Sequence, residues 1–437
     1  MKILKFGSAS IATAEKIKNV AEILSSRQNN IIVLSSMRGT AEALTEISDY
    51  LYKKNQEGAI EIINRLEKEY FDLAKSLFIE IKTQESAKEV ISSKFDYIRS
   101  FTKDMFTLFE QRVVMAQGEL ISSELFYLYL KEKGLNVTLI PALDFMRTDK
   151  NSIPDPIYIK DKLTALLEAS NNADIFLTQG YICRNAYGEI DDLRKGGSDY
   201  TASLVGVAVG AEEIQIWADV DAMQNNDPRY VKGTKAIPYL NFDEAAELAY
   251  FGEKILHPSS ILPAKLSDIP VRLMNIEYPD AEGTLISNET DNEIIKAVAA
   301  KDNITAIKVK SGKMLLAHGF LRRVTEVFEK YQTSIDMLTT SEIGVSLTID
   351  DNHNLQLIID DLKKYGTVSV DTDMVIISII GDLESTGSGI SNNIFEALKG
   401  INIRMISYGG SRYNFSFLVS KEDKEKTLQI LNDKLFN

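Results

Sequence analysis

The chain has 437 residues, of which 44% are hydrophobic and 26% are charged, a composition typical of a globular protein with several domains. Its formal net charge of −14 argues against nucleic acid or an anionic membrane surface as a partner, because an acidic protein is repelled by both. The single cysteine, Cys183, excludes a disulfide framework, and the widely spaced histidines give a zinc site no support. The N-terminal stretch lacks a signal-peptide pattern, and no apolar run approaches the roughly 18 residues of a membrane span, so we expect a cytoplasmic protein.

The N-terminal part of the chain alternates strand and helix patterns. Residues 2–6 favour a short strand that ends at Gly7, and residues 11–26 have the apolar spacing of a helix. Residues 30–36 form a continuous apolar run, which is typical of a buried parallel strand. Residues 41–132 have helical spacing without a proline and predict a long helical region. This order predicts an α/β fold.

The same alternation continues after the long helical region. The segment CRNAYGEIDDL, residues 183–193, predicts a hairpin around Tyr187 and Gly188. Further strands are predicted at residues 136–142, 174–182, 212–219 and 271–276, and further helices at residues 160–170, 198–211 and 242–250.

Two similar blocks occupy the chain from residue 295 onward. Residues 306–349 read as strand, loop, helix, strand and strand, and residues 373–420 repeat that order. A helix follows each block, at residues 354–366 and 421–436. This pattern predicts a duplicated βαββαβ unit, which behind an enzyme-like domain suggests a regulatory module.

Lys5 and Gly7 lie where the first strand ends, in the sequence KFGSAS. At such a junction backbone N–H groups and a basic side chain meet at the carboxyl end of a strand, which favours an anion. An ordinary strand-to-helix turn with a surface lysine would have the same sequence.

Residues 194–199, RKGGSD, have a similar character. Arg194 and Lys195 supply positive charge, and the two glycines let a ligand approach the backbone. Ser198 or Asp199 is expected to cap the helix that follows, and Asp199 is also suited to hold a lysine ammonium. A capped helix after a basic turn is the simpler explanation.

Other polar residues are weak signals individually. Asp219 and Arg229 follow a predicted strand, Lys254 precedes His257, and Glu119 lies in the long helical region. A lone charged residue on a helix or loop is usually solvated. The nucleotide-binding P-loop and the protein-kinase motifs are absent from the sequence.

The order of the segments KFG, GELIS, RKGGSDYTA, DV…NNDPR and KILHPSS resembles that of aspartokinases, in the amino-acid kinase family. The segments HGFLRRVTEVFEKYQTSIDMLTTSEIGVSLTID and INIRMISYGGSRYNFSFLVS resemble the paired ACT domains of lysine-sensitive aspartokinases. The resemblance covers essentially the whole chain. It implies an amino-acid kinase fold, with a mostly parallel central sheet between helices, followed by two ACT domains. The implied boundaries are 1–290 for the kinase domain, 309–373 for the first ACT domain, and 295–308 plus 374–437 for the second.

The resemblance implies ATP-dependent phosphorylation of the L-aspartate side chain to 4-phospho-L-aspartate, the first step toward lysine, threonine and methionine. Mg²⁺ is implied to arrive with ATP. Lys5 is implied to neutralise the transferring phosphoryl group, and Asp199 to orient Lys5. The implied aspartate-side residues are Glu119, Arg194, Lys195 and Ser198, and the implied nucleotide-side residues are Gly7, Ser8, Asp219, Arg229 and Lys254.

The resemblance also implies a lysine effector site between ACT domains of two subunits, and so a homodimer or a dimer of dimers. Asp336 and Glu342 suit an ammonium group, and loop N–H groups suit a carboxylate. The implied effector residues are Met314, Ala317, Phe320, Leu321, Ser334, Ile335, Asp336, Thr340, Ser341 and Glu342.

The kinase half departs from the family pattern at several positions. Glu42 would place a negative charge near an anionic substrate, at a cost on the order of a few kcal/mol. Three hypotheses therefore stay open: a lysine-inhibited aspartate kinase, a weakened or inactive homologue with a working regulatory half, and a lysine-binding module. The altered positions are Ser8, Ala9, Ala41, Glu42, Lys195 and Ala218.

Overall fold

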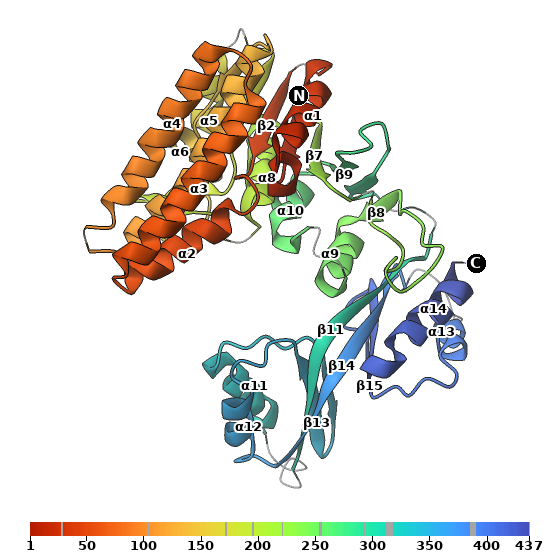
Figure 1. The fold of residues 1–437 in the computed structure, drawn as a ribbon. Helices are drawn as coiled ribbons and strands as arrows, with labels where there is room; N and C mark the ends of the chain where they lie inside the picture. Colours follow the sequence, from red (N-terminus) through yellow and green to blue (C-terminus); the bar gives the residue numbers. More distant parts are fainter. Residues whose placement is uncertain are drawn as a thin grey trace. The chain divides into compact units, whose positions relative to one another are not determined.

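The chain forms two compact units in the computed structural model (Figure 1). The first comprises residues 1–223 and 256–290, and the second comprises residues 224–255 and 291–437. The described ranges are 1–27, 29–103, 105–170, 173–194, 196–220, 222–252, 256–289, 291, 293–311, 318–384 and 390–436.

The first unit is built on a sheet with the strand order β3–β4–β2–β1–β7–β9–β10. Neighbours from β3 to β9 pair in parallel, whereas β10 is antiparallel to β9. The carboxyl ends of the parallel strands therefore share one edge, where α/β proteins bind ligands. The strands are β1 Lys2–Phe6, β2 Asn30–Leu34, β3 Val137–Leu139, β4 Ile175–Gln179, β7 Glu213–Ala218, β9 Val271–Asn275 and β10 Thr284–Ser287.

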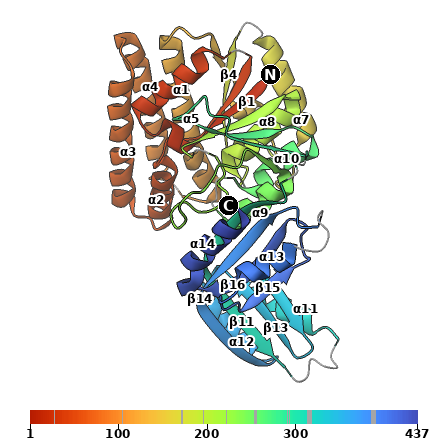
Figure 2. The same cartoon turned by 90° about the vertical axis from the view of Figure 1, so that its right-hand side faces the viewer.

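Helices cover both faces of this sheet (Figure 2). The helices α1 to α5 lie on one face, and α7, α8 and α10 lie on the other. Their bounds are α1 Ala14–Ser25, α2 Thr40–Tyr52, α3 Gln56–Leu77, α4 Ile81–Ser100, α5 Leu108–Glu132, α6 Ala142–Phe145, α7 Pro156–Ala169, α8 Gly197–Val209 and α10 Pro258–Leu266.

Alternation along β1 explains why both faces are covered. Leu4 and Phe6 join the apolar cluster formed with α1 to α5, whereas the buried Ile3 points toward α8. A Cβ at Gly206 of α8 would lie 2.7 Å from Ile214 Cδ1 and 3.6 Å from Ile3 Cγ1. Glycine at this position lets α8 pack closely on the sheet.

The expected helical region at residues 41–132 consists of four separate helices, α2 to α5. The Asn55 side chain caps α3, and Thr107 with Glu110 forms a capping box at the start of α5. These polar residues end the helical pattern without a proline. The expected helix at 11–26 is preceded by a 3-10 turn, Ser8–Ile11, so α1 begins only after its Thr13 cap.

The predicted hairpin around Tyr187 and Gly188 is confirmed. β5 (Ile182–Arg184) and β6 (Ile190–Asp192) pair antiparallel on either side of that turn. The hairpin leads directly into the turn that opens α8.

The second unit contains a sheet with the order β12–β13–β11–β14–β16–β15. Its strands are β11 Ile295–Lys310, β12 Leu338–Ser341, β13 Gly344–Ile349, β14 Thr367–Gly381, β15 Met405–Tyr408 and β16 Asn414–Ser420. The unit also contains β8 Tyr239–Asn241, α9 Phe242–Phe251, α11 Phe320–Lys330, α12 Leu355–Leu362, α13 Ile390–Ala397, the 3-10 turn η3 Lys421–Asp423 and α14 Lys424–Leu435.

The two longest strands of this sheet serve both repeated blocks. β11 pairs with β13 through residues 305–310 and with β14 along most of its length. β14 pairs with β16 through residues 374–380. One apolar cluster packs α11 and α12 on the sheet, and another packs α13 and α14. The duplicated order of elements is confirmed, while the boundaries 1–290, 309–373 and 295–308 plus 374–437 stay a prediction.

Segment 224–255 packs with the second unit although it precedes the repeats in sequence. Its helix α9 begins at a capping box formed by Asn241 and Glu244. Across the described ranges, no helix is both long and apolar enough to cross a membrane.

Candidate active site

An ion pair joins the end of β1 to the start of α8. Lys5 Nζ lies 2.6 Å from Asp199 Oδ1, and the two side chains are only 13% and 14% exposed. A Cβ at Gly7 would lie 3.3 Å from Lys5 Nζ, so glycine leaves room for the ammonium. The lysine charge is therefore fixed at the carboxyl edge of the sheet, where partial burial strengthens its attraction for an anion.

Two glycines shape the turn into α8. Gly196 and Gly197 have φ angles of 77° and 52°, which favour glycine. A Cβ at Gly196 would also lie 2.6 Å from Ser260 Cβ, so this turn has no room for a larger residue. The positive end of the α8 dipole lies at this turn and favours an anion.

The expectation that Ser198 or Asp199 caps α8 is wrong. Gly196 is the N-cap, and no side chain of the described residues bonds there. Ser198 Oγ instead accepts a hydrogen bond from Ser35 Oγ at 2.9 Å, while Asp199 binds Lys5. Both side chains therefore face the carboxyl edge of the sheet. Ser35 follows β2, and Lys5 lies near the end of β1.

The ends of β2 and β4 complete this side of the site. Ser35 follows β2, and its backbone N–H donates to the Phe6 carbonyl of β1 at 3.1 Å. Gly180 follows β4, and a Cβ there would lie 2.4 Å from Ser198 Oγ. Close packing at Gly180 thus holds Ser198 against the strand ends.

Glu119 of α5 is a buried carboxyl group at this site. It is 6% exposed, and burial raises its pKa to about 8, although bonds from the Ser36 backbone and hydroxyl and the nearby Lys5 charge lower it. Its Oε2 has no hydrogen-bond partner among the described residues. A carboxyl group in this state gains most from a ligand that brings a positive charge.

Tyr181 adds a strained residue beside Glu119. Its φ is 67°, and its N–H donates to Thr201 Oγ1 at 2.9 Å. Burial raises the pKa of its hydroxyl, as do the bonded Asp192 and the Glu119 charge. A bulky residue with positive φ persists only where its surroundings hold it.

The other predicted residues of this unit are less constrained. Ser8 is exposed at the start of the 3-10 turn, and Asp219 is exposed just after β7, at the same sheet edge as Lys5. Arg194 is exposed with a φ of 51°, and its N–H donates to Asp192 Oδ1 at 2.8 Å. Lys195 lies outside the described residues.

One predicted nucleotide-side residue, Arg229, falls in the second unit. The Arg229 guanidinium forks onto Asp227, with Nε 2.9 Å from Oδ1 and Nη2 2.7 Å from Oδ2. Lys254 lies outside the described residues.

Sequence reasoning missed Ser35, Ser36 and Gly180. Their position immediately after buried strands was an available signal, because ligands bind at the carboxyl ends of parallel strands. Tyr181 carries no comparable signal, since its contacts arise from distant segments.

Asp336 of the second unit is held from two directions. Lys301 Nζ of β11 lies 2.6 Å from Asp336 Oδ1, and the Tyr250 hydroxyl of α9 donates to the same oxygen at 2.8 Å. Lys301 also lies 2.9 Å from Asp350 Oδ2 and 4.2 Å from the centre of the Tyr250 ring. Burial alone would lower the pKa of Lys301, but its bonds to Asp336 and Asp350 raise it. The Asp336 side chain is 0% exposed, and its Oδ2 has no partner among the described residues.

The other predicted effector residues that the structure describes lie in the first repeat. Phe320 is buried at the start of α11, and Leu321 beside it is exposed. Met314 and Ala317 lie outside the described residues. The other five are Ser334, which is exposed, Ile335, which is partly buried, Thr340 and Ser341 on the edge strand β12, and Glu342, which is exposed.

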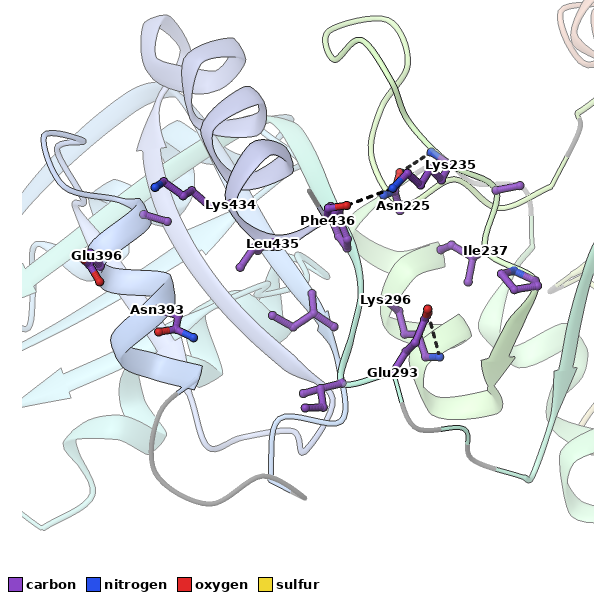
Figure 3. Close-up of a pocket in the computed structure, with 15 residues that line it drawn as sticks. Asn225, Lys235, Ile237, Glu293, Lys296, Asn393, Glu396, Lys434, Leu435 and Phe436 are labelled. Atoms are coloured by element: carbon purple, nitrogen blue, oxygen red, sulfur yellow. Dashed lines mark hydrogen bonds and ion pairs between the residues drawn. The ribbon is translucent and has the colours of Figure 1, made fainter.

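A cavity of about 710 Å³ lies within the second unit (Figure 3). Segment 225–238, the start of β11, α13 and α14 form its wall. Lys296 in the wall is paired with Asp291, and Lys235 Nζ donates to the Phe436 carbonyl at 3.1 Å. The described wall contains none of the predicted site residues, and these two lysines already have partners. Within the described ranges, no group of three or more His, Cys, Asp or Glu side chains is placed to hold a metal ion.

Two protein-family models match different parts of the chain. Residues 1–275 match the model of the amino acid kinase family, and residues 377–435 match a model of the ACT domain. The chain is 32% identical over 447 residues to lysine-sensitive aspartokinase 3 of Escherichia coli, with 99% of each chain covered. It is also 32% identical over 461 residues to chloroplastic aspartokinase 1 of Arabidopsis thaliana, covering 99% of this chain and 80% of that protein.

Solved structures show the same likeness. One is E. coli aspartokinase III in complex with aspartate and ADP, with a TM-score of 0.82 and 31% identity. Another is the same enzyme in complex with lysine and aspartate, with a TM-score of 0.86 and 31% identity. Both comparisons cover 100% of this chain and of the compared chain.

We predict that Glu119→Gln stabilises the protein at alkaline pH. The raised pKa means that the native state binds the Glu119 proton more tightly than the unfolded chain, so wild-type stability falls as pH rises from about 4.5 to about 8. Glutamine imitates the neutral carboxyl group and avoids this loss, which amounts to a few kcal/mol.

The measurement is the melting temperature of both proteins from pH 4.5 to pH 9. The melting temperature of Glu119→Gln should exceed that of the wild type only slightly at pH 4.5 and by several degrees at pH 9. Glu168→Gln, an exposed change on α7, serves as the control. A gap that is equal at both ends would contradict the prediction.

Proposed function

This chain belongs to the aspartokinase family, and from that premise we propose that it phosphorylates the side-chain carboxylate of L-aspartate with ATP, giving 4-phospho-L-aspartate and ADP. The observation that carries the proposal is the partly buried Lys5–Asp199 pair at the carboxyl edge of the sheet. The E. coli aspartokinase structure with aspartate and ADP supports this choice of substrates.

In the proposed reaction, a carboxylate oxygen of aspartate forms a bond to the γ-phosphorus of ATP. The bond from that phosphorus to the oxygen shared with the β-phosphate breaks, and ADP leaves with the electron pair. Both reactants are anions, so positioning and charge neutralisation must supply most of the catalysis. Lys5 is proposed to neutralise the transferring group, and Asp199, 2.6 Å away, to keep its ammonium in position. Mg²⁺ enters as part of the nucleotide substrate.

Glu119 is proposed to bind the ammonium group of aspartate. Its buried carboxyl group has an oxygen without a partner among the described residues, and only a cationic ligand group compensates its ionisation. Ser198 and its partner Ser35 border the same region. Arg194 and Lys195 on the aspartate side, and Gly7, Ser8, Asp219, Arg229 and Lys254 on the nucleotide side, keep their proposed roles from the family resemblance.

A weakened or inactive kinase is the second hypothesis. Ala41 and Ala218 lack the polar groups of the family pattern, and Glu42 adds a negative charge. In the structure Glu42 is exposed in the first turn of α2, where the helix dipole favours a carboxylate. This placement gives the Glu42 carboxylate a stabilising role in α2 that does not depend on the reaction.

Lysine is the proposed feedback inhibitor. The E. coli structure with lysine and aspartate supports this choice, and Asp336 is the proposed ligand of an effector ammonium because its Oδ2 has no partner among the described residues. Lysine bound there would shift the enzyme between active and inactive arrangements through its different affinity for the two. A homodimer or dimer of dimers, formed through the ACT domains, is proposed with it.

The first test is an ATP-dependent assay that traps aspartyl phosphate with hydroxylamine, with and without lysine. We expect a signal that lysine suppresses, and no signal from a Lys5→Met control. A wild-type protein that gives no signal but binds lysine by calorimetry would favour the inactive homologue or the lysine-binding module. A signal that saturating lysine leaves unchanged would contradict the proposed regulation.

Aspartate binding at pH 7 should release about one proton. Glu119, with a pKa of about 8, is mostly protonated in the free protein, and an ammonium ligand would lower that pKa and ionise the group. Calorimetry in buffers of different ionisation enthalpy measures the release. Glu119→Gln removes the titrating group and should abolish it. Identical binding heats for the wild type in all buffers would show that Glu119 does not bind the ammonium.

Lys301→Met should make lysine inhibit at about tenfold lower concentration. Lys301 is an ammonium group already bound to Asp336, so it competes with an effector ammonium for that carboxylate. Lys308→Met, an exposed change on the same strand β11, should leave inhibition unchanged. The readout is the lysine concentration that gives half inhibition. Loss of inhibition in Lys301→Met would mean that Lys301 assembles the effector site rather than competes for it.

A further inference from the structure

Tyr70 places a hydroxyl group deep in the apolar cluster of the first unit. The residue lies on α3, is 0% exposed, and packs its ring 5.8 Å from that of Phe95. Its hydroxyl lies between Thr40 Oγ1, at 2.9 Å, and Ser122 Oγ, at 3.1 Å. Burial raises its pKa to about 12, so the group stays neutral. A phenylalanine would fill the same space, so the hydroxyl can be removed with little change in packing.

The two partners of Tyr70 belong to elements that border the active site. Thr40 is the first residue of α2 and ends the loop 35–40, which begins at the carboxyl end of β2. Ser122 lies on α5, one turn after Glu119, and its Oγ accepts the Met37 N–H at 2.9 Å. The Thr40 N–H also donates to the Met37 carbonyl at 3.1 Å. Tyr70 therefore fastens the back of the loop to α5.

The first two residues of the same loop contact Ser198 and Glu119 of the candidate active site. Ser35 Oγ donates to Ser198 Oγ, and Ser36 bonds Glu119 through its backbone and its hydroxyl. The position of these two serines relative to Glu119 thus depends on how firmly residues 37–40 are held.

We propose that Tyr70 is a positioning residue for the aspartate side of the phosphoryl-transfer site, acting through the loop 35–40. The expected effect on the KM for aspartate rests on the proposed function. The claim that Tyr70 holds the loop rests only on its hydrogen bonds to Thr40 and Ser122. Removing the hydroxyl leaves the buried Thr40 hydroxyl without its described side-chain partner, and a buried polar group without a partner drives local rearrangement.

The test compares Tyr70→Phe with Tyr129→Phe. Tyr129 lies on α5, is 2% exposed, and belongs to the same apolar cluster, so it is a matched deletion of one hydroxyl. We expect Tyr70→Phe to raise the KM for aspartate about tenfold and leave the KM for ATP within about twofold. Ser122→Ala should act in the same direction, and Tyr129→Phe should change neither constant.

Two further readouts separate positioning from a general loss of stability. Amide hydrogen exchange in peptides that cover residues 35–40 should quicken in Tyr70→Phe and stay unchanged in Tyr129→Phe. The pH midpoint of kcat/KM for aspartate should rise, because weaker bonds from Ser36 leave Glu119 with a higher pKa.

An unchanged KM for aspartate together with unchanged exchange in Tyr70→Phe would overturn the inference. Parallel loss of affinity for aspartate and ATP would also overturn it, because that result indicates a structural role. If the wild-type protein makes no aspartyl phosphate, the proposed function fails instead, and the exchange comparison still decides whether Tyr70 holds the loop.

Discussion

The site depends on the attraction between Lys5 and Asp199. The proposed reaction joins two anions and needs a positive charge that is fixed in place and shielded from water. A partly buried ammonium 2.6 Å from a carboxylate meets both needs. The pair exists because β1 ends beside the start of α8. Glycines lie around this contact: a Cβ at Gly7 would lie 3.3 Å from Lys5 Nζ, and one at Gly206 of α8 would lie 2.7 Å from Ile214 Cδ1 of the sheet. These glycines leave room for the Lys5 ammonium and for close packing of α8 on the sheet.

Each unit also contains a buried carboxyl group with one oxygen that lacks a hydrogen-bond partner among the described residues. In the first unit this is Glu119 Oε2, and in the second it is Asp336 Oδ2; neither has a partner among the described residues. Ionising such a group lowers the stability of the folded protein unless a positively charged ligand pairs with it. An ammonium ligand therefore stabilises the ligand-bound form. The difference lies in the neighbours, because Glu119 is bonded mainly by Ser36, whereas Asp336 already holds Lys301.

The hydrogen bond between Tyr250 and Asp336 joins a residue within the kinase family match to a residue of the first repeat. Residues 224–255 fall within the part that matches the amino acid kinase family, yet α9 packs with β11 and β14. Tyr250 lies in the last turn of α9, and its hydroxyl is bonded to the carboxylate that is the proposed effector ligand. Asp336 is therefore hydrogen-bonded to a segment that lies within the kinase family match.

Local patterns were enough to predict the alternation of strands and helices, the hairpin at Tyr187 and Gly188, the duplicated blocks and, through ordered motifs, the family. These features depend on spacing over a few residues, which the chain displays directly. The breaks within residues 41–132 escaped prediction because caps such as Thr107 interrupt a helix without disturbing its apolar period. The family resemblance had already implied that Asp199 orients Lys5. The partners of Ser198, Tyr70 and Asp336 were decided only by the tertiary structure. Each comes from a segment distant in sequence, and which strand ends and helices meet depends on the order of strands in the sheet and on packing across it.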